Sequence, residues 1–322
     1  MTKKLIVSAL VLIAVVGGVV WLLNNEPAGD QVGFDESAAL KVVTTSTMVT
    51  DMVKNVGGER ISVIGLMGPK VDPHSFQVTA TASAALKKAD IVIYSGLHLE
   101  GKMQETLEKR AEEKKDSFAV TDGIPEAMLL KPEEDFEGYH DPHVWGNPEV
   151  WTHCLAVVVK ALSDADPEGA EGYAERAEQY KEELLKLHTW AKARMAEVPA
   201  AQRVLVTSHD AFFYLGQAYG YEVRGLQGVS TNSEAGLKER AELVHFIKQR
   251  QLKMIFPESS VNAKGIKAVA DEAGVKVSEH ELFSDAMGEP GDVVEVNGEN
   301  YDRGTYIGMM KHNINSIVEG LK

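Results

Sequence analysis

The tripeptide Asp-Pro-His occurs twice in this sequence, ending once at His74 and once at His143. Proline fixes its own φ and biases the residue before it towards extended geometry, so each copy predicts a stiff turn that holds its imidazole in one direction. Asp72 and Asp141 would then orient the neighbouring imidazole or cap the turn. A third histidine, His209, has an aspartate directly after it instead of before it. Fixed imidazoles together with an acidic group are the parts of a preorganised metal site.

Imidazole nitrogen and carboxylate oxygen are ligands that suit zinc, and a larger share of oxygen suits manganese. Three histidines and one aspartate can surround a small divalent cation at about 2.0–2.2 Å and leave no position for water. Such a closed site favours binding over catalysis, because a catalytic zinc keeps one position open. The sequence also lacks the His-Glu-x-x-His motif of metalloproteases and the Gly-x-Ser-x-Gly motif of many hydrolases.

The elements that must position these residues alternate between strand and helix. Two β-branched runs, 41–45 and 61–66, flank a helical stretch at 47–56, which predicts a βαβ unit and therefore a parallel sheet. Further strands are expected at 91–94, 118–121, 203–207, 254–256 and 275–277, and further helices at 79–88, 102–115, 149–162, 210–219, 236–249, 264–273 and 305–321. Between the two sets of strands, apolar spacings of three and four predict one helix from 168 to 196. At 1.5 Å per residue it is about 40 Å long, enough to join two lobes stiffly, although an ordinary surface helix has the same pattern.

The fold class that we expect is α/β, with two α/β lobes that contain parallel sheets and are joined by this long rigid helix. The expected boundaries are a signal or membrane-anchor segment at 1–23, a flexible tether at 24–40, an N-terminal lobe at 41–167, the linking helix at 168–198 and a C-terminal lobe at 199–322. Two domains agree with a length of 322 residues, which is long for a single core.

Several candidate ligands share one position relative to these elements. His74, His209, Glu258 and Asp285 each follow an expected strand, and ligands of open α/β sheets bind beyond the carboxyl ends of the strands. Two lobes that face each other would place His74 and His143 opposite His209 and Asp285, with the metal in the cleft. Glu258 has three possible roles: a ligand, an acceptor for a histidine N–H, or a loop residue.

Composition and the amino-terminal segment limit the class of protein. A net charge of −15 argues against a nucleic-acid partner, and the single cysteine, Cys154, excludes a thiolate cluster and is expected to be buried. Lys3 and Lys4 precede an apolar run at 5–23, which predicts export and favours an uncleaved membrane anchor over a removed signal peptide. No cysteine follows that run, so lipid attachment at an amino-terminal cysteine is not expected.

From residue 41 to 322 the chain resembles the zinc/manganese solute-binding proteins of ABC importers, of the TroA-like kind. The resemblance rests on the segments Val-Asp-Pro-His-Ser-Phe at 71–76, His-Asp-Pro-His-Val-Trp at 140–145, Thr-Ser-His-Asp-Ala-Phe at 207–212, Pro-Glu-Ser-Ser at 257–260 and Leu-Phe-Ser-Asp-Ala-Met-Gly at 282–288. It implies His74, His143, His209 and Asp285 as the metal ligands. His209 stands where manganese carriers tend to have glutamate, so the resemblance implies Zn²⁺, with Mn²⁺ as the alternative.

The function that we expect is therefore capture of a divalent transition metal outside the cytoplasmic membrane. The partners implied by the resemblance are an ABC permease and its ATPase, and the protein is expected to be a monomer and not an enzyme. Release is expected to involve loop movement near Asp285, because Gly288 and Gly291 follow it. Two other classes remain open: an exported metal-dependent hydrolase with Glu258 as general base, and an adhesin-like surface protein.

Overall fold

The computed structural model describes residues 33–132, 136 and 138–322. Residues 34–322 form one compact unit, and Phe34 is already buried in it. The packed structure therefore begins a few residues before residue 41, where the N-terminal lobe was expected to start, and includes part of the predicted tether. The predicted anchor at 5–23 lies outside the described residues. Within the described residues, no helix is both long enough and apolar enough to cross a membrane.

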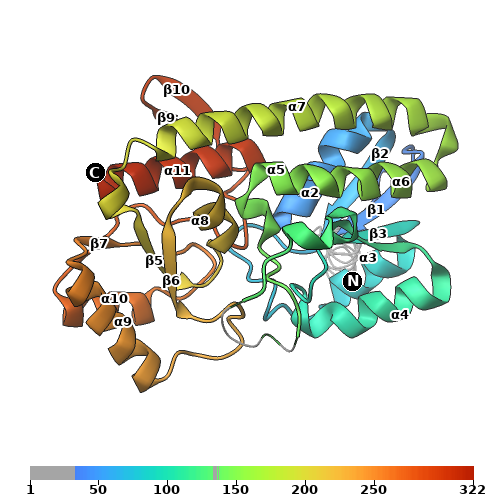
Figure 1. The fold of residues 1–322 in the computed structure, drawn as a ribbon. Coiled ribbons are helices and arrows are strands. Elements are labelled where there is room, and N and C mark those ends of the chain that lie inside the picture. Colours follow the sequence, from blue (N-terminus) through green and yellow to red (C-terminus); the bar gives the residue numbers. More distant parts are fainter. Residues whose placement is uncertain (1–32, 133–135, 137) are drawn as a thin grey trace, which may run out of the picture. The chain divides into compact units, whose positions relative to one another are not determined.

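The first half of this unit contains a four-stranded parallel sheet with the order β2-β1-β3-β4 (Figure 1). Its strands are β1 (Leu40–Thr44), β2 (Ile61–Gly65), β3 (Ile91–Tyr94) and β4 (Ser117–Ala119), and its helices are α2 (Thr47–Gly57), α3 (Ala80–Lys88) and α4 (Gln104–Lys114). Every residue of β3 is buried, as expected for a strand covered on both faces. The hydroxyls of Ser46 and Thr79 cap α2 and α3. The predicted βαβ unit and parallel sheet are confirmed.

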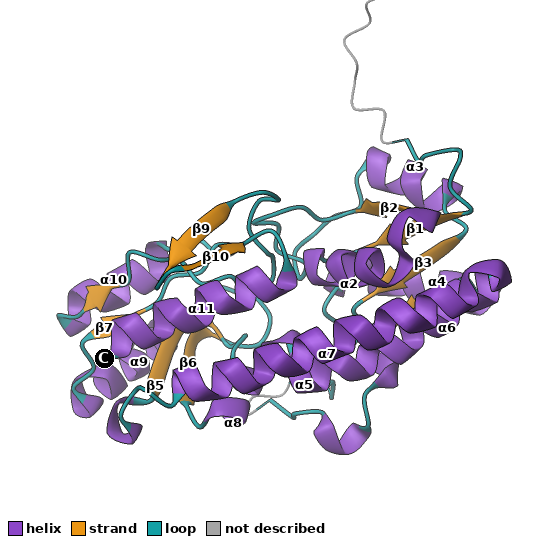
Figure 2. Ribbon diagram, turned by 90° about the horizontal axis from the view of Figure 1, so that it is seen from above, coloured by secondary structure: helices purple, strands orange, loops and turns teal. Residues whose placement is uncertain are grey.

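The helix expected at 149–162 is interrupted. It consists of α5 (Pro148–Trp151) and α6 (Leu155–Ala165), with a 3-10 turn between them. The long helix is present as α7 (Ala170–Met195) and buries one stripe that includes Tyr173, Leu184 and Met195. It contacts α2 and α6 from the first half and α11 (Tyr306–Leu321) from the second. Figure 2 shows α7 lying alongside both sets of elements, so it supports the two halves of the unit as one stiff rod.

The second half contains two parallel strand pairs, β5-β6 and β7-β8. The strands are β5 (Val204–His209), β6 (Glu222–Gln227), β7 (Met254–Ile255) and β8 (Lys276–Val277), and the helices are α8 (Phe213–Tyr219), α9 (Leu237–Arg250), α10 (Lys264–Ala273) and α11. The amide of Phe256 donates a hydrogen bond to the carbonyl of Val206 at 2.9 Å, which connects the two pairs. We did not predict β6 from the sequence, because its mixed polar and apolar residues and its central Gly225 make a weak strand pattern.

Residues 288–303, for which no helix or strand was expected, contain an antiparallel hairpin of β9 (Val293–Val296) and β10 (Glu299–Asp302). Its two-residue turn is Asn297-Gly298, with φ of 54° and 79°. Both turn residues have positive φ, which asparagine and glycine tolerate best in a tight hairpin. The Asn-Gly pair, which follows Val296, is a typical hairpin signal that we did not use in predicting the elements from the sequence.

Candidate metal centre

The four predicted ligands meet in the interior, although they come from four separate segments. His74 lies in the loop between β2 and α3, His143 precedes α5, His209 ends β5 and Asp285 lies between β8 and the hairpin. All four side chains are buried, with exposed fractions of 0–1%. One potential ligand atom from each lies within 4.8 Å of the others. Two of these segments come before α7 in the chain and two come after it, so the cluster lies where the two halves face each other.

The ligand atoms lie close enough to share one small cation. His74 Nε2 lies 3.3 Å from His143 Nε2, Asp285 Oδ1 lies 3.3 Å from His143 Nε2, and Asp285 Oδ2 lies 3.3 Å from His209 Nε2. These three contacts match the edges of about 3.3–3.4 Å of a tetrahedron with bonds of about 2.0–2.1 Å, whereas the four ligand atoms as a set lie within 4.8 Å of one another, so a bound cation would draw them closer together. His209 Nε2 and Asp285 Oδ1 are buried and have no hydrogen bond of good geometry within the described part of the chain. A divalent cation would satisfy both.

The two Asp-Pro-His turns have the same local structure. Asp72 Oδ1 accepts the backbone N–H of His74 at 2.9 Å, and Asp141 Oδ1 accepts that of His143 at 2.9 Å. Asp141 Oδ1 also lies 2.7 Å from His143 Nδ1, whereas His74 Nδ1 has no partner in the described residues. The expected turn caps are therefore present in both copies, but only Asp141 also holds the ring.

Glu258 holds the ring of His209 from behind. Its Oε1 accepts the backbone N–H of His209 at 2.9 Å, and its Oε2 lies 2.5 Å from Nδ1. An isolated parallel bridge between Glu258 and Leu282 sets this carboxylate beside the segment that carries Asp285. Among the three possible roles, the contacts are those of an acceptor for a histidine N–H. Since both oxygens are occupied by His209, Glu258 is not placed to act as a general base.

Burial and charge act in opposite directions on these groups. Burial lowers the pKa of His74 to about 3. Burial also lowers the pKa of His143, but the Asp141 and Asp285 carboxylates outweigh it and raise that pKa to about 9. For His209, burial is likewise outweighed by Asp285 and Glu258, which raise its pKa well above the usual value. Burial raises the pKa of Asp285, yet His209 and His143 bring it well below its usual range. The buried carboxylates thus create an anionic environment that favours a cation.

The segment that carries Asp285 is firmly held. Trp145 Nε1 donates to the carbonyl of Ser284 at 2.8 Å. Asn313 on α11 accepts the N–H of Phe283 at 2.8 Å and donates to its carbonyl at 2.7 Å. The N–H of Met287 donates to Thr47 Oγ1 at 2.9 Å. These contacts give little support to the expectation that this segment moves during release.

The other single residue weighed from the sequence is Cys154, which is fully buried. Burial raises the pKa of its thiol well above the usual value, so it behaves as a small apolar side chain, as expected. His98 stacks on Tyr139, with ring centroids 4.6 Å apart and an interplanar angle of 14°. Neither residue belongs to the four-ligand cluster.

Comparison with known proteins identifies the family of this chain. Residues 42–320 match the family described as zinc-uptake complex component A, periplasmic. The chain is 41% identical over 299 residues to the manganese-binding lipoprotein MntA of Bacillus subtilis (strain 168), a match that covers 91% of this chain and 93% of the relative. It is also 41% identical over 286 residues to the zinc-binding protein TroA of Treponema pallidum (strain Nichols), with 87% of this chain and 88% of the relative covered.

Solved structures agree in fold. The periplasmic zinc binding protein TroA from Treponema pallidum superposes with a TM-score of 0.80 at 40% identity, covering 88% of this chain and 99% of that structure. The laminin binding protein Lmb of Streptococcus agalactiae, described as a bifunctional protein with adhesin and metal transporting activity, superposes with a TM-score of 0.72 at 25% identity, covering 88% of this chain and 100% of that structure. The chain therefore belongs to the zinc-uptake component A family, the TroA-like substrate-binding proteins of metal ABC importers, and is not an enzyme.

Proposed function

We propose that this protein captures Zn²⁺ through His74, His143, His209 and Asp285 and delivers it to an ABC permease powered by an ATPase. The observation that carries the proposal is the buried set of four ligand atoms within 4.8 Å of one another, in which each Nε2 atom has another ligand atom 3.3 Å away, close to the edge of a tetrahedral zinc site. Three nitrogen donors and one carboxylate favour zinc over manganese, which prefers more oxygen. Mn²⁺ remains the alternative cargo, and the two relatives of 41% identity are named for different metals.

The proposed setting is the outer face of the cytoplasmic membrane, with the run at 5–23 as the anchor. The sequence of that run supports the anchor. The relative MntA is named a lipoprotein, which supports a location at the membrane but implies a different attachment. The boundaries 41–167, 168–198 and 199–322 are proposed for the two lobes and the linking helix, supported by the contacts of α7 with both halves. A monomer is the proposed state.

The test is a calorimetric titration of metal-stripped protein with Zn²⁺ and, separately, with Mn²⁺. We expect one tight site for Zn²⁺ that is lost in His74→Ala and in Asp285→Ala. The matched control is His245→Ala, because His245 is exposed on α9 and lies outside the cluster. Micromolar or weaker binding of both metals to the unaltered protein would refute the proposal. Tighter binding of Mn²⁺ than of Zn²⁺ would reverse the choice of cargo.

A second candidate activity is adhesion, favoured by the similarity to Lmb, whose description names an adhesin. A binding assay on immobilised laminin distinguishes the two activities, because metal import does not require laminin. Binding of metal-free His74→Ala protein to laminin would support adhesion, and no binding in either metal state would exclude it for that partner.

A further inference from the structure

A short surface segment reaches from the second half of the unit to the turn that carries His74. The strap, defined here as residues 229–235, connects β6 to α9. Thr231 Oγ1 on the strap donates a hydrogen bond to Asp72 Oδ2 at 2.6 Å. The other oxygen of the same carboxylate, Oδ1, accepts the backbone N–H of His74 at 2.9 Å. One carboxylate therefore connects the strap to a ligand.

Gly101 lies beside this contact, and both the His74 turn and the strap pack closely against it. A Cβ atom added to Gly101 would lie 3.0 Å from the carbonyl oxygen of His74 and 3.5 Å from Asn232 Nδ2. The first distance is shorter than most Cβ contacts. The absence of a side chain at residue 101 thus leaves room for both the His74 turn and the strap.

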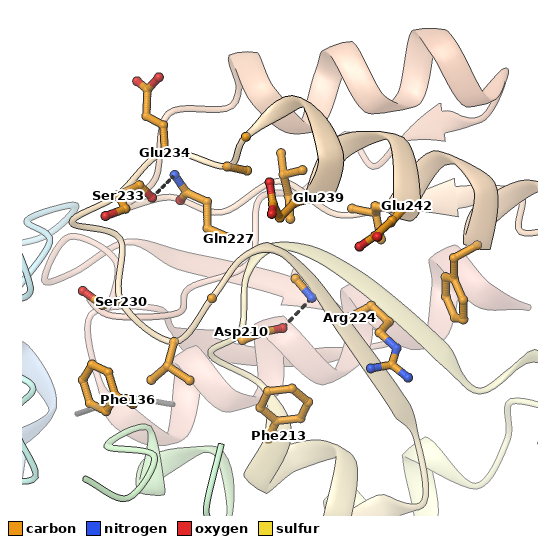
Figure 3. Close-up of a pocket in the computed structure, with 18 residues that line it drawn as sticks. Phe136, Asp210, Phe213, Arg224, Gln227, Ser230, Ser233, Glu234, Glu239 and Glu242 are labelled. Atoms are coloured by element: carbon orange, nitrogen blue, oxygen red, sulfur yellow. Dashed lines mark hydrogen bonds between the residues drawn. The ribbon is translucent and has the colours of Figure 1, made fainter. Parts of the chain in front are cut away.

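The strap is loosely packed on the side that faces two cavities. Two cavities adjoin it, with volumes of about 720 and 530 Å³, and residues 234–236 line both. Figure 3 shows the larger one, with Ser230, Ser233 and Glu234 of the strap along one side. Gln227 Nε2 donates to the carbonyl of Ser233 at 3.3 Å, a long hydrogen bond. Low local packing of this kind is typical of segments that open at small cost in free energy.

His74 is the ligand that depends most on such outside support. The rings of His143 and His209 are held at Nδ1 by Asp141 and Glu258. His74 Nδ1 has no partner among the described residues, so its ring is directed by the turn alone. A change at Asp72 therefore reaches His74 more directly than a change elsewhere reaches the other two imidazoles.

We propose that the Thr231 hydroxyl is a latch between the strap and the His74 turn, and that its bond to Asp72 limits the rate at which bound metal leaves. While the latch is closed, Asp72 keeps the His74 turn in place and the strap lies against it. When the latch opens, the strap moves towards the adjoining cavities and His74 is the first ligand released. This inference rests on the proposed metal-binding function and assigns Thr231 and Asp72 as positioning residues.

The test measures zinc dissociation by stopped-flow absorbance after mixing Zn²⁺-loaded protein with an excess of a chromogenic chelator. Thr231→Val keeps the shape of the side chain and removes the hydroxyl, so we expect dissociation about five- to tenfold faster, the size expected for one hydrogen bond to a carboxylate that is partly exposed to solvent. Thr231→Ser restores the hydroxyl and should return the rate to within about twofold of the original. The rescue separates a role of the hydroxyl from a general effect on folding.

Ser75→Ala is a comparison variant, because Ser75 Oγ donates to the same Asp72 Oδ2 at 2.7 Å but belongs to the same turn as His74. Because this bond also steadies the turn, an increase in Ser75→Ala is compatible with the latch. The neutral control is Thr189→Val, which removes an exposed hydroxyl bonded to the carbonyl of Leu185 at 3.0 Å on α7, away from the site, and should leave the rate within about twofold of the unaltered protein. An unchanged rate in Thr231→Val, or an equal increase in Thr189→Val, overturns the latch. If the unaltered protein fails to bind Zn²⁺ at all, the proposed function fails instead, so the two failures are distinguishable.

Discussion

Replacing Glu258 by glutamine tests whether the carboxylates behind the imidazoles act through geometry or through charge. Glu258 uses both oxygens, one for the His209 backbone N–H and one for Nδ1. Glutamine has one carbonyl oxygen and one NH₂ group, so its oxygen can accept only one of the two hydrogen bonds. At the other contact the NH₂ group either faces a second N–H donor or donates to Nδ1, which must then be unprotonated. If the NH₂ group faces Nδ1, the imidazole proton moves to Nε2, the nitrogen that faces Asp285. That tautomer cannot bind a cation.

Asp141→Asn removes the same charge but keeps the same contacts. Asp141 Oδ1 alone receives both the His143 N–H and Nδ1, while Oδ2 has no hydrogen-bond partner in the described residues. An asparagine can therefore keep its carbonyl oxygen at the Oδ1 position and direct its NH₂ group to the other side. The two substitutions form a matched pair in which only Glu258→Gln disturbs the ring.

We expect Glu258→Gln to weaken zinc binding by about ten- to 100-fold, or about 1.4–2.7 kcal/mol, the range for groups that orient a metal ligand. For Asp141→Asn we expect less than about tenfold. The assay is competition for Zn²⁺ against a chelating dye at pH 7.5, with thermal unfolding of the metal-free variants as the check on folding. A loss in Asp141→Asn that equals or exceeds the loss in Glu258→Gln would refute the geometric reasoning and assign the effect to charge.

Three further outcomes follow from the same contacts. Because the pKa of His143 is raised to about 9 in the metal-free site and that of His209 is raised as well, a cation must displace protons at neutral pH, and affinity should increase from pH 6 towards pH 9 by about tenfold per pH unit for each proton displaced. Titration calorimetry in buffers of different ionisation enthalpy measures that release, and an affinity that does not change between pH 6 and 8 would contradict it. Saturation with Zn²⁺ at 100 times the dissociation constant should stabilise the folded state by about 2.7 kcal/mol; the increase in melting temperature should vanish with chelator and be absent in His74→Ala. Gly225→Ala should destabilise the protein by about 1–3 kcal/mol in urea unfolding, because the added Cβ would lie 2.5 Å from the His209 carbonyl carbon and 2.6 Å from the Asp210 nitrogen. The control Gly265→Ala meets only a flexible Leu226 methyl at 3.0 Å, and an equal loss there would show that the backbone contact is not the cause.

Local chemistry explains which parts of the fold could be predicted from the sequence. The Asp-Pro-His turns depend on contacts between residues two apart, such as Asp141 and His143. Helices with clear spacing, such as α7 and α10, agree with their expected positions within about two residues. The exceptions are β6, where pairing with β5 replaces a weak local pattern, and the break between α5 and α6.

The contacts that complete the site join residues far apart in the chain, and no local pattern encodes them. Glu258 and His209 are 49 residues apart, and Thr231 and Asp72 are 159 apart. The sequence offered three roles for Glu258, and only the bridge between residues 258 and 282 places its carboxylate behind the imidazole. The two Asp-Pro-His turns also differ for a tertiary reason, because Asp72 receives the Thr231 hydroxyl from the strap while Asp141 receives the imidazole of its own turn.

The sequence by itself determined the kinds of ligand, the stiff turns that carry two of them and the alternation that builds parallel sheets, because each of these depends on neighbours along the chain. The tertiary structure decided which nitrogen each ring presents, which carboxylate holds it and which ring is left without support. Those features depend on packing between segments that meet only after folding, and in the proposed function they would set how tightly a cation is held.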